Sequence, residues 1–437
     1  MRLGRRRFLA LAAAAPALGA APPRRGIRAI EHDGVLIGEC SLEGETRADD
    51  VVPGQASAIP LSRDRWLVLT STRGFRFVDD DRSIVYQLRR GGSAGPVIRE
   101  GRLARFRDER QHGHPVAFGV PKGARIGGKP APNANVFAAK WRWGEKGARG
   151  VEWVQFRLND RDDDLEILQP PVPLRQKGYE EGPEFCSAGN VAWMNQTFTP
   201  PVAWSRDCTE WADCNYFDGG RIAALKYAFR SGRYEWIETG PAFSEAGRNT
   251  FEPSLARFRD SWVVCARSSG GVARGGAGWT RTDDPFRALP PLVYPASPAT
   301  DAPVTAFRCA DGRLRLFGGD HASSPYRRTR DPLYAWEIDP DRGFACSDRR
   351  LIFDSLAAGL PLRLESWPKI DMPKLLPAEG NVQRLVHRVS VRSFNAPYPN
   401  RPAIPLIAPA EKAACATYSA RIVYDEVEPL PWGFVPG

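Results

Sequence analysis

The stretch Phe251-Glu252-Pro253-Ser254-Leu255, followed by the apolar run Trp262-Val263-Val264-Cys265-Ala266 and closed by Arg267, decides the fold of this chain. It indicates two short strands, with an acid at the start of the first and an arginine at the end of the second. A charge within short buried strands is costly unless it is paired or opens onto water. We therefore expect Glu252 and Arg267 to meet a partner or to line a water-filled site.

Short apolar runs separated by turn residues recur along the rest of the chain, with no long segment of helical period. Their recurrence at roughly 40–60 residues fits the four-stranded blades of a β-propeller. At about 65–70 residues per blade, an all-β propeller of six four-stranded antiparallel blades accounts for the chain. A β-sandwich and a five-bladed propeller with long loops are the alternatives. The turns Asp218-Gly219-Gly220 and Asp311-Gly312 predict hairpins that lead into inner strands.

The N-terminus has the pattern of an export signal. Arg5-Arg6-Arg7-Phe8-Leu9 is followed by a short alanine-rich stretch that ends near Ala21, whereas a membrane span needs roughly 20 apolar residues. Paired arginines before Phe-Leu resemble a twin-arginine signal, and an ordinary signal peptide is the alternative. We expect residues 1–21 to be a leader and residues 22–437 to be one propeller domain. The mature protein is expected to be periplasmic or secreted, without stable membrane insertion.

The composition narrows the range of partners. The chain has 437 residues, 42% of them hydrophobic, with 41 Gly and 39 Pro, which suits a large core with many turns. Its formal net charge is +10, and 57 basic residues face 51 acidic ones once the four leader arginines are removed. The arginines are scattered and form no basic stripe, so nucleic acid is not the expected partner. A basic cleft for an anionic or sugar-acid ligand fits the pattern better.

The eight cysteines include no CxxC motif and no Cys/His cluster. We therefore expect no structural zinc, no other metal and no cofactor. Cys208 and Cys214 lie in one loop-like stretch and are the best local pair for a disulfide in an exported protein. Cys265 lies in an apolar strand, where a small buried side chain is expected.

The stretch 251–267 also resembles a known family. It is similar to the segment of sialidase-like β-propellers in which a glutamate and an arginine point into the central pocket. That family binds a sugar carboxylate with three arginines from three blades, because a planar guanidinium makes a two-pronged contact with a carboxylate. The resemblance implies Arg73, with Arg76 beside it, as the first arginine, Arg267 as the second and Arg330 as the third.

The repeated Asp-box turn of that family, which joins outer strands, is present only in degenerate form. Its degenerate copies are Ser205-Arg206-Asp207-Cys208-Thr209-Glu210-Trp211 and the stretch from Trp279 to Phe286. We expect both to be structural.

The resemblance fails at the position of the family's tyrosine nucleophile, because no tyrosine occurs between Tyr334 and Tyr398. Asp371 is the polar residue nearest to that position. A carboxylate can serve as nucleophile or base in a glycosidase. The alternative is that Asp371 caps a turn before Pro373.

Family members place an acid/base aspartate on a loop after the first blade, where this chain has Asp79-Asp80-Asp81. Asp80 and its two neighbours are candidates that the sequence does not rank, and a solvated turn is the alternative. His112 and His114 share one face of a predicted strand. His114 is a candidate general acid, with simple hydrogen bonding as the alternative.

Trp193, Asn195 and Tyr326 supply the rings and amide that a sugar site needs. Together with the arginines they predict an exported sialidase-like glycoside hydrolase for an acidic or deoxy-sugar glycan. In this hydrolase, Glu252 and Asp371 are expected to lie beside one another and to act as general acid/base or nucleophile. A non-catalytic carbohydrate-binding propeller, with its carboxylates salt-bridged and far apart, is the main alternative. A lyase is favoured only if a His–Tyr pair replaces the paired acids.

Overall fold

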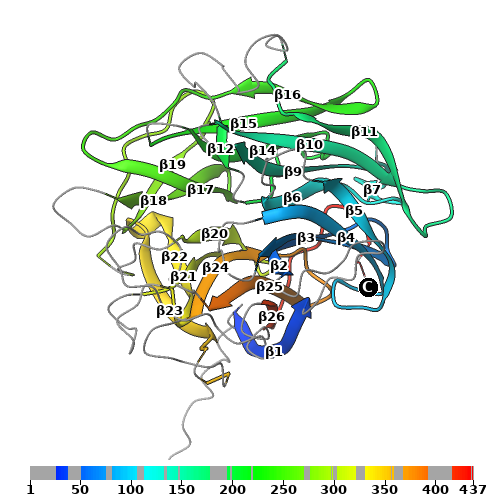
Figure 1. Ribbon diagram of the computed structural model, residues 1–437. Helices are drawn as coiled ribbons and strands as arrows, with labels where there is room; N and C mark the ends of the chain where they lie inside the picture. Colours follow the sequence, from blue (N-terminus) through cyan, green and yellow to red (C-terminus); the bar gives the residue numbers. More distant parts are fainter. Residues whose placement is uncertain are drawn as a thin grey trace, which may run out of the picture.

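The computed structural model describes residues 26–37, 51–74, 81–105, 113–131, 135–145, 148–177, 194–196, 199–217, 220–269, 276–296, 298, 303–320, 330–355, 357–358, 368–391, 416–434 and 436. All but two short strands belong to six antiparallel sheets, arranged in a ring as the blades of a propeller (Figure 1). The predicted six-bladed all-β fold is therefore confirmed. No helix in the described part of the chain is long and apolar enough to cross a membrane.

The first three blades follow one another along the chain, and in each the strands run from the inside of the ring outward. Blade 1 consists of β2 (Val51–Pro60), β3 (Arg65–Gly74), β4 (Asp81–Arg90) and β5 (Val97–Arg105). Blade 2 consists of β6 (Gly113–Val120), β9 (Val136–Glu145), β10 (Ala148–Leu158) and β11 (Leu165–Pro173), with the small hairpin of β7 (Arg125–Ile126) and β8 (Lys129–Pro130) between β6 and β9. Blade 3 consists of β12 (Met194–Gln196) and β13 (Val202–Ala203), which both pair with β14 (Glu210–Phe217), then β15 (Arg221–Arg230) and β16 (Arg233–Thr239).

The last three blades complete the ring. Blade 4 consists of β17 (Asn249–Phe258), β18 (Ser261–Ser269) and β19 (Gly276–Thr282), and Val293 bridges to Trp279 at the place of a fourth strand. Blade 5 consists of β20 (Thr305–Arg308), β21 (Leu314–Gly318), β22 (Leu333–Asp339) and β23 (Ala345–Phe353), with the 3-10 turn η1 (Pro340–Arg342) before β23. Blade 6 consists of β24 (Pro368–Leu375), β25 (Val382–Val391), β26 (Ala416–Tyr424) and β1 (Ile27–Ile37).

Strand β1 closes the ring, because it comes first in the chain yet forms the outer strand of the last blade. It pairs antiparallel with β26, from Ile27 opposite Tyr424 to Ile37 opposite Thr417. The two ends of the described chain are thus held together by backbone hydrogen bonds. Closure of this kind leaves only short protected sheet edges.

The core is divided among the blade junctions. Six clusters of buried apolar side chains are found among the described residues, and each joins two neighbouring blades. Along β18, Val263 and Cys265 pack toward blade 5, while Trp262, Val264 and Ala266 pack toward blade 3. The run 262–266 is therefore apolar at every position because both faces of the blade are covered.

The predicted disulfide between Cys208 and Cys214 is wrong, since both are free thiols. Cys208 lies in the turn before β14 and packs between blades 2 and 3, whereas Cys214 lies within β14 and packs between blades 3 and 4. Side chains that fill different junctions cannot form one bond. Burial raises the pKa of Cys208 to about 11. The prediction for Cys265 is confirmed, because it is fully buried in β18.

The degenerate Asp-box copy at Ser205–Trp211 is a tight structural turn. The Ser205 hydroxyl donates to Asp207 at 2.6 Å and accepts from the backbone N–H of Glu210 at 2.9 Å. The indole N–H of Trp211 donates to the carbonyl of Cys208 at 2.9 Å. The turn joins β13 to β14, on the inner side of blade 3. It thus differs from the expected place between outer strands.

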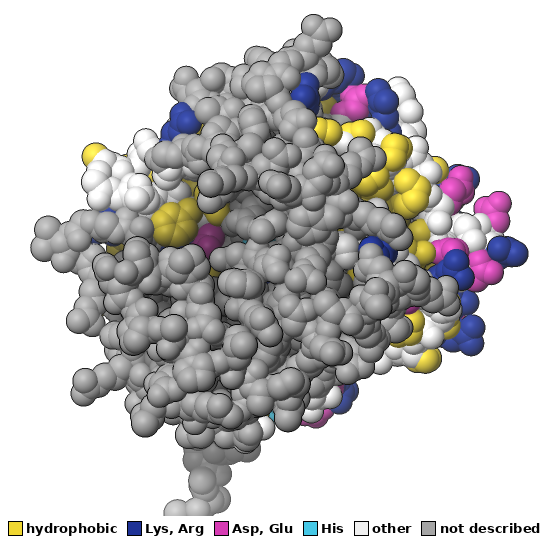
Figure 2. Space-filling view, viewed as in Figure 1, with side chains coloured by type: hydrophobic (Ala, Val, Ile, Leu, Met, Phe, Trp, Pro, Cys, Tyr) yellow, Lys and Arg dark blue, Asp and Glu magenta, His cyan; other side chains and the backbone are white. Residues whose placement is uncertain are grey.

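The outer surface carries charges of both signs in close alternation. Figure 2 shows Lys and Arg side chains interleaved with Asp and Glu at the edge where β5 and β11 lie in Figure 1. Arg157 pairs with Glu166 at 2.7 Å and Arg99 with Asp164 at 3.1 Å in this region. These two arginines are thus committed to ion pairs.

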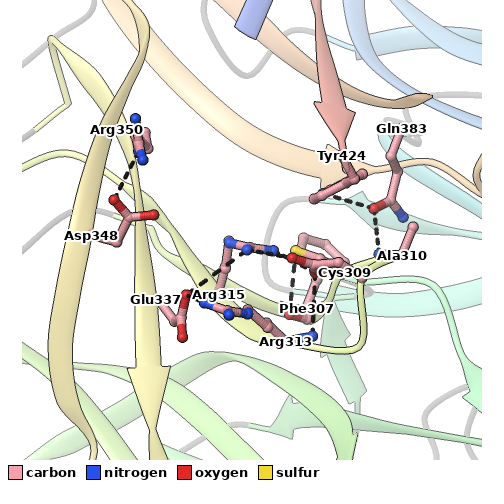
Figure 3. A network of polar contacts seen from close by, with 11 residues as sticks. Phe307, Cys309, Ala310, Arg313, Arg315, Glu337, Asp348, Arg350, Gln383 and Tyr424 are labelled. Atoms are coloured by element: carbon pink, nitrogen blue, oxygen red, sulfur yellow. Dashed lines mark hydrogen bonds and ion pairs between the residues drawn. The ribbon is translucent and has the colours of Figure 1, made fainter. Parts of the chain in front are cut away.

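The Asp311-Gly312 hairpin joins β20 to β21, as predicted, and Gly312 has a φ of 79°. The side chain of Asp311 is fully buried and accepts two hydrogen bonds from Arg315, at 2.7 and 2.6 Å. Arg313 and Glu337 form a second pair beside it, and the Ala310 backbone N–H of blade 5 donates to the Gln383 side-chain oxygen of blade 6 at 2.9 Å (Figure 3). The same oxygen accepts from the Tyr424 hydroxyl. This network fastens the end of blade 5 to blade 6.

Candidate functional site

The innermost strands of the six blades face the axis of the ring and are hydrogen-bonded on one side only within their sheets. The pairing register of β2, β6, β12, β17 and β24 is interrupted once in each strand, whereas β20 pairs regularly. Such β-bulges bend a strand and aim side chains in a new direction, and they are frequent next to active sites. We call the residues at these interruptions the bulge ring.

Most bulges of the ring have one pattern, in which two residues oppose a single residue of the second strand. His114-Pro115 lies opposite Trp141, Glu252-Pro253 opposite Ala266, and Met372-Pro373 opposite His387. Proline lacks a backbone N–H and is tolerated in a sheet only at edges and bulges. The proline within each pair is therefore the sequence feature that marks the bulge.

The other two members differ in composition. In β2 the bulge is Gly54-Gln55, opposite Ser71, and the Gln55 backbone N–H donates to the Ser71 hydroxyl at 3.1 Å. In β12 the extra residue is Asn195, between Met194 and Gln196. The ring thus contains the predicted residues His114, Asn195 and Glu252 and adds Gln55, which the sequence analysis missed.

His114 and Glu252 have left-handed backbone conformations, with φ values of 58° and 53°. Both residues are buried, with exposed fractions of 6% and 9% for the whole residue. A non-glycine residue held in this region costs roughly 1–3 kcal/mol, and such strain is concentrated at functional sites. Two of the predicted catalytic side chains therefore come from strained positions on the axis.

Glu252 and Arg267 form the best-defined polar unit of the site. The Arg267 Nη1 donates to the Glu252 Oε2 at 3.0 Å, and the guanidinium lies 4.8 Å from the centre of the Phe251 ring. Both side chains keep a small open surface, 20% for Arg267 and 12% for Glu252. Each of the two charges thus has a partner, which is one of the two outcomes expected from the sequence.

Arginines recur at one register position in the second strands. Arg142 pairs with Gly113, Arg267 with Phe251 and Arg388 with Asp371, in each case with the residue just before the bulge. In blade 1, Arg73 pairs with Val52, one position further from the bulge. The repeat adds Arg142 and Arg388 to the candidates. Their signal in the sequence is an arginine that ends the apolar run after each X-Pro pair.

Polar contacts between inner strands lie directly after the bulges. The Ser254 hydroxyl accepts from the Ala306 backbone N–H at 2.9 Å, and the Thr305 hydroxyl donates to the Pro373 carbonyl at 2.8 Å. The Lys374 ammonium donates to the Pro115 carbonyl at 2.7 Å. Burial lowers the pKa of Lys374 to about 7. These contacts fix the bulges relative to one another.

The remaining predicted site residues are placed unequally. Asp371 and Arg73 are described by their backbone positions in β24 and β3. Arg330 is half-buried and precedes β22, the third strand of blade 5, so it does not share the register position of Arg267. Four residues lie outside the described ranges: Arg76, Asp80, Trp193 and Tyr326.

Glu252 and Asp371 belong to blades 4 and 6, with blade 5 between them. They are thus on different sides of the axis and do not lie on neighbouring inner strands. In the described part of the chain, no group of three or more His, Cys, Asp or Glu residues is arranged to hold a metal ion.

Comparisons with known proteins identify the fold. No protein-family model matches this chain. No curated protein sequence matches it either. Among solved structures, it is similar to Trypanosoma rangeli sialidase, with a TM-score of 0.51, 9% identity and coverage of 84% of this chain and 54% of that one. It is also similar to an α-L-arabinofuranosidase from Fusarium graminearum in complex with an iminosugar inhibitor, with a TM-score of 0.50, 8% identity and coverage of 90% and 97%.

The chain therefore spans about half the length of the sialidase, 54%, and nearly the whole arabinofuranosidase, 97%. The architecture is that of a sialidase-like propeller. At identities of 8–9%, the likeness concerns the fold alone.

Proposed function

We propose that this protein is an exported glycoside hydrolase that acts on an acidic or deoxy-sugar glycan bound at the bulge ring. The observation that carries the proposal is the Glu252–Arg267 unit on a strained bulge of an innermost strand. The fold supports it, because propellers of this architecture include a sialidase and an arabinofuranosidase.

Arg267 is suited to hold the acidic group of the ligand. One of its nitrogens, Nη1, is bound to Glu252, while its buried Nε has no hydrogen-bond partner. A buried N–H without an acceptor is costly, and a ligand oxygen placed beside it removes that cost. The guanidinium then bridges Glu252 and the ligand.

In hydrolysis, the glycosidic C–O bond breaks, water supplies a hydroxyl to the anomeric carbon and a proton goes to the leaving oxygen. Glu252 serves as the base that takes the proton from the attacking water. The proton donor is His114 or Asp80. Asp371 provides the second carboxylate, as nucleophile or base.

A non-catalytic glycan-binding propeller is the second candidate. It is favoured by the commitment of the Glu252 carboxylate to Arg267 at 3.0 Å, and by the placement of Glu252 and Asp371 on blades that are not neighbours. In this alternative the arginines bind the ligand and no bond is broken.

A panel of acidic and deoxy-sugar glycans distinguishes the two candidates when binding and reducing-end release are measured together. For a hydrolase, Glu252→Gln and Asp371→Asn should each lower turnover by roughly 10²–10⁴-fold, with binding retained. Glu166→Gln, which alters an exposed ion pair on β11, serves as the matched control and should keep full turnover. Binding without release in the unmodified protein would establish the binding-only candidate. Absence of both would contradict each of them.

Export through the twin-arginine route is the second part of the proposal. It rests on Arg5-Arg6-Arg7-Phe8-Leu9 and the apolar stretch that follows. Fusing residues 1–21 to a reporter that folds before export should deliver active reporter to the periplasm. The double change Arg6→Lys and Arg7→Lys should abolish delivery. Delivery that survives this change would contradict the route.

A further inference from the structure

Lys374 places a buried cation at the axis of the propeller. Its exposed fraction is 1%, and its ammonium reaches from β24 of blade 6 to the carbonyl of Pro115 in β6 of blade 2. Among the described side chains and backbone groups, that carbonyl is its only hydrogen-bond partner, and no carboxylate among them pairs with it. A buried charge without a counter-ion is strongly unfavourable.

Gln55 belongs to β2, the innermost strand of blade 1. Blade 1 separates blade 6, which carries Lys374, from blade 2, which carries Pro115. It occupies the β2 bulge, at the level that Pro115 and Pro373 occupy in β6 and β24. Its exposed fraction is 2%, and neither the oxygen nor the nitrogen of its side-chain amide has a hydrogen-bond partner.

The next residue, Ala56, packs with Leu376 and Val386 of blade 6, which brings this part of β2 against the strands that carry Lys374. The large majority of buried side-chain polar atoms in proteins have a hydrogen-bond partner, either a protein group or an ordered water. The unsatisfied amide lies on the strand between the two blades that Lys374 joins, and no described carboxylate neutralises that lysine. Together they indicate a ligand position that both groups can share.

A second buried lysine of the same ring shows how the fold satisfies such a group internally. The Lys140 ammonium is completely buried, and it pairs with Asp213 and donates to the Tyr227 hydroxyl at 3.0 Å. The chain thus supplies a carboxylate where a buried ammonium only joins two blades. The lack of one at Lys374 distinguishes the axial position.

We propose that the axis between β24, β2 and β6 is a subsite for a compact anion, held by the ammonium of Lys374 and the amide N–H of Gln55. The ligand class is a small oxyanion or carboxylate, either free in solution or as the acidic group of a larger molecule. This inference goes beyond the proposed glycan chemistry and does not depend on it, because a free anion is sufficient to fill the subsite.

The test measures thermal unfolding of the full mature chain at pH 6 during titration with sodium phosphate, acetate or glucuronate. Ionic strength is held constant with a bulky buffer anion. The unmodified protein should show a saturable rise in melting temperature with at least one of these anions. Lys374→Met should lose the response, and Lys122→Met, which removes an equal charge from the surface pair with Asp162, should keep it.

If Lys374→Met does not fold, the neutral change Gln55→Leu tests the same claim. Calorimetric titration of the effective anion should then show at least tenfold weaker binding than to the unmodified protein. An identical response in the unmodified protein, Lys374→Met and Lys122→Met would overturn the proposal, as would unchanged affinity in Gln55→Leu. A response to phosphate and acetate identifies a free-anion subsite, and a response to glucuronate alone identifies a site for a sugar acid. Because no glycan is cleaved in this test, its outcome is separate from that of the hydrolase proposal.

Discussion

Glu252 occupies a backbone conformation that only glycine adopts without cost, and it does so with a buried carboxylate. The bulge that produces this conformation turns the side chain toward Arg267. The strained backbone lowers the free energy of unfolding and holds one carboxylate on the axis. Strained conformations of this kind are concentrated at functional sites.

The size of this strain can be measured with two substitutions that both remove the carboxylate. We expect Glu252→Gly to be more stable than Glu252→Ala by about 1 kcal/mol, because glycine accepts the φ of 53° and alanine does not. Urea unfolding of the two variants gives the difference. Equal stability of both would show that the position is unstrained.

Arg267 provides a second prediction at the scale of one residue. Arg267→Lys keeps the charge beside Glu252 but loses the planar two-pronged contact with a ligand carboxylate. Ligand affinity should fall at least tenfold, whereas the melting temperature should change by only a few degrees, because the pair is partly open to solvent. A large loss of stability with unaltered binding would make Arg267 a structural ion-pair residue.

Lys374 links stability to pH. Burial lowers its pKa from 10.5 to about 7, so between these values the folded protein has released a proton that the unfolded chain still binds. Stability should therefore rise with pH from 7 to 9 by up to about 1.4 kcal/mol per unit. Above pH 9 the buried thiols act in the opposite sense, since burial raises the pKa of Cys208 and Cys346 to about 11.

Urea unfolding at pH 7, 8 and 9 in a buffer with a bulky anion checks this prediction. The slope should disappear in Lys374→Met and persist in Lys122→Met. A flat profile in the unmodified protein would contradict the effect of burial on Lys374.

At the scale of the strand, the bulge is the repeated unit of the site. The sequence contains its signal in His114-Pro115, Glu252-Pro253 and Met372-Pro373, because proline inside an apolar strand requires an edge or a bulge. From the sequence, His114 and Glu252 are candidates for separate reasons, His114 as a general acid and Glu252 as the partner of Arg267 in one stretch. Only the pairing register shows that they are equivalent positions, and that Arg142 and Arg388 correspond to Arg267.

Gln55 and Lys374 could not be selected from the sequence. Each is one polar residue in an apolar run, and its importance comes from neighbours that are distant along the chain. For the same reason, the sequence could not show that Cys208 and Cys214 are free thiols. Which junction each thiol fills depends on how blades 2, 3 and 4 pack against one another.

The hairpin between β20 and β21 gives a prediction at this scale. Removing one partner of the buried Asp311–Arg315 pair leaves an uncompensated charge, so Arg315→Met or Asp311→Asn should each cost roughly 3–5 kcal/mol in unfolding free energy. The double variant Asp311→Leu with Arg315→Met should recover most of that loss. Urea unfolding measures all three, and single changes that cost under about 1 kcal/mol would show that the pair does not stabilise the blade 5–6 junction.

At the scale of the molecule, the number of blades was predictable because short apolar runs recur at a nearly constant interval. The closure of the ring was not, since pairing of β1 with β26 joins segments from opposite ends of the chain. The six junctions divide the apolar core among them and leave polar groups at the axis. The candidate functional residues therefore lie on the bulge ring at the axis, and not on the outer strands of the blades.

A crystal structure of the protein with a bound acidic glycan fragment tests that account most directly. We expect the acidic group to contact the guanidinium of Arg267, with the sugar within hydrogen-bond reach of Glu252 and His114. A fragment bound on the outer strands of the blades, with the Glu252–Arg267 pair untouched, would contradict it.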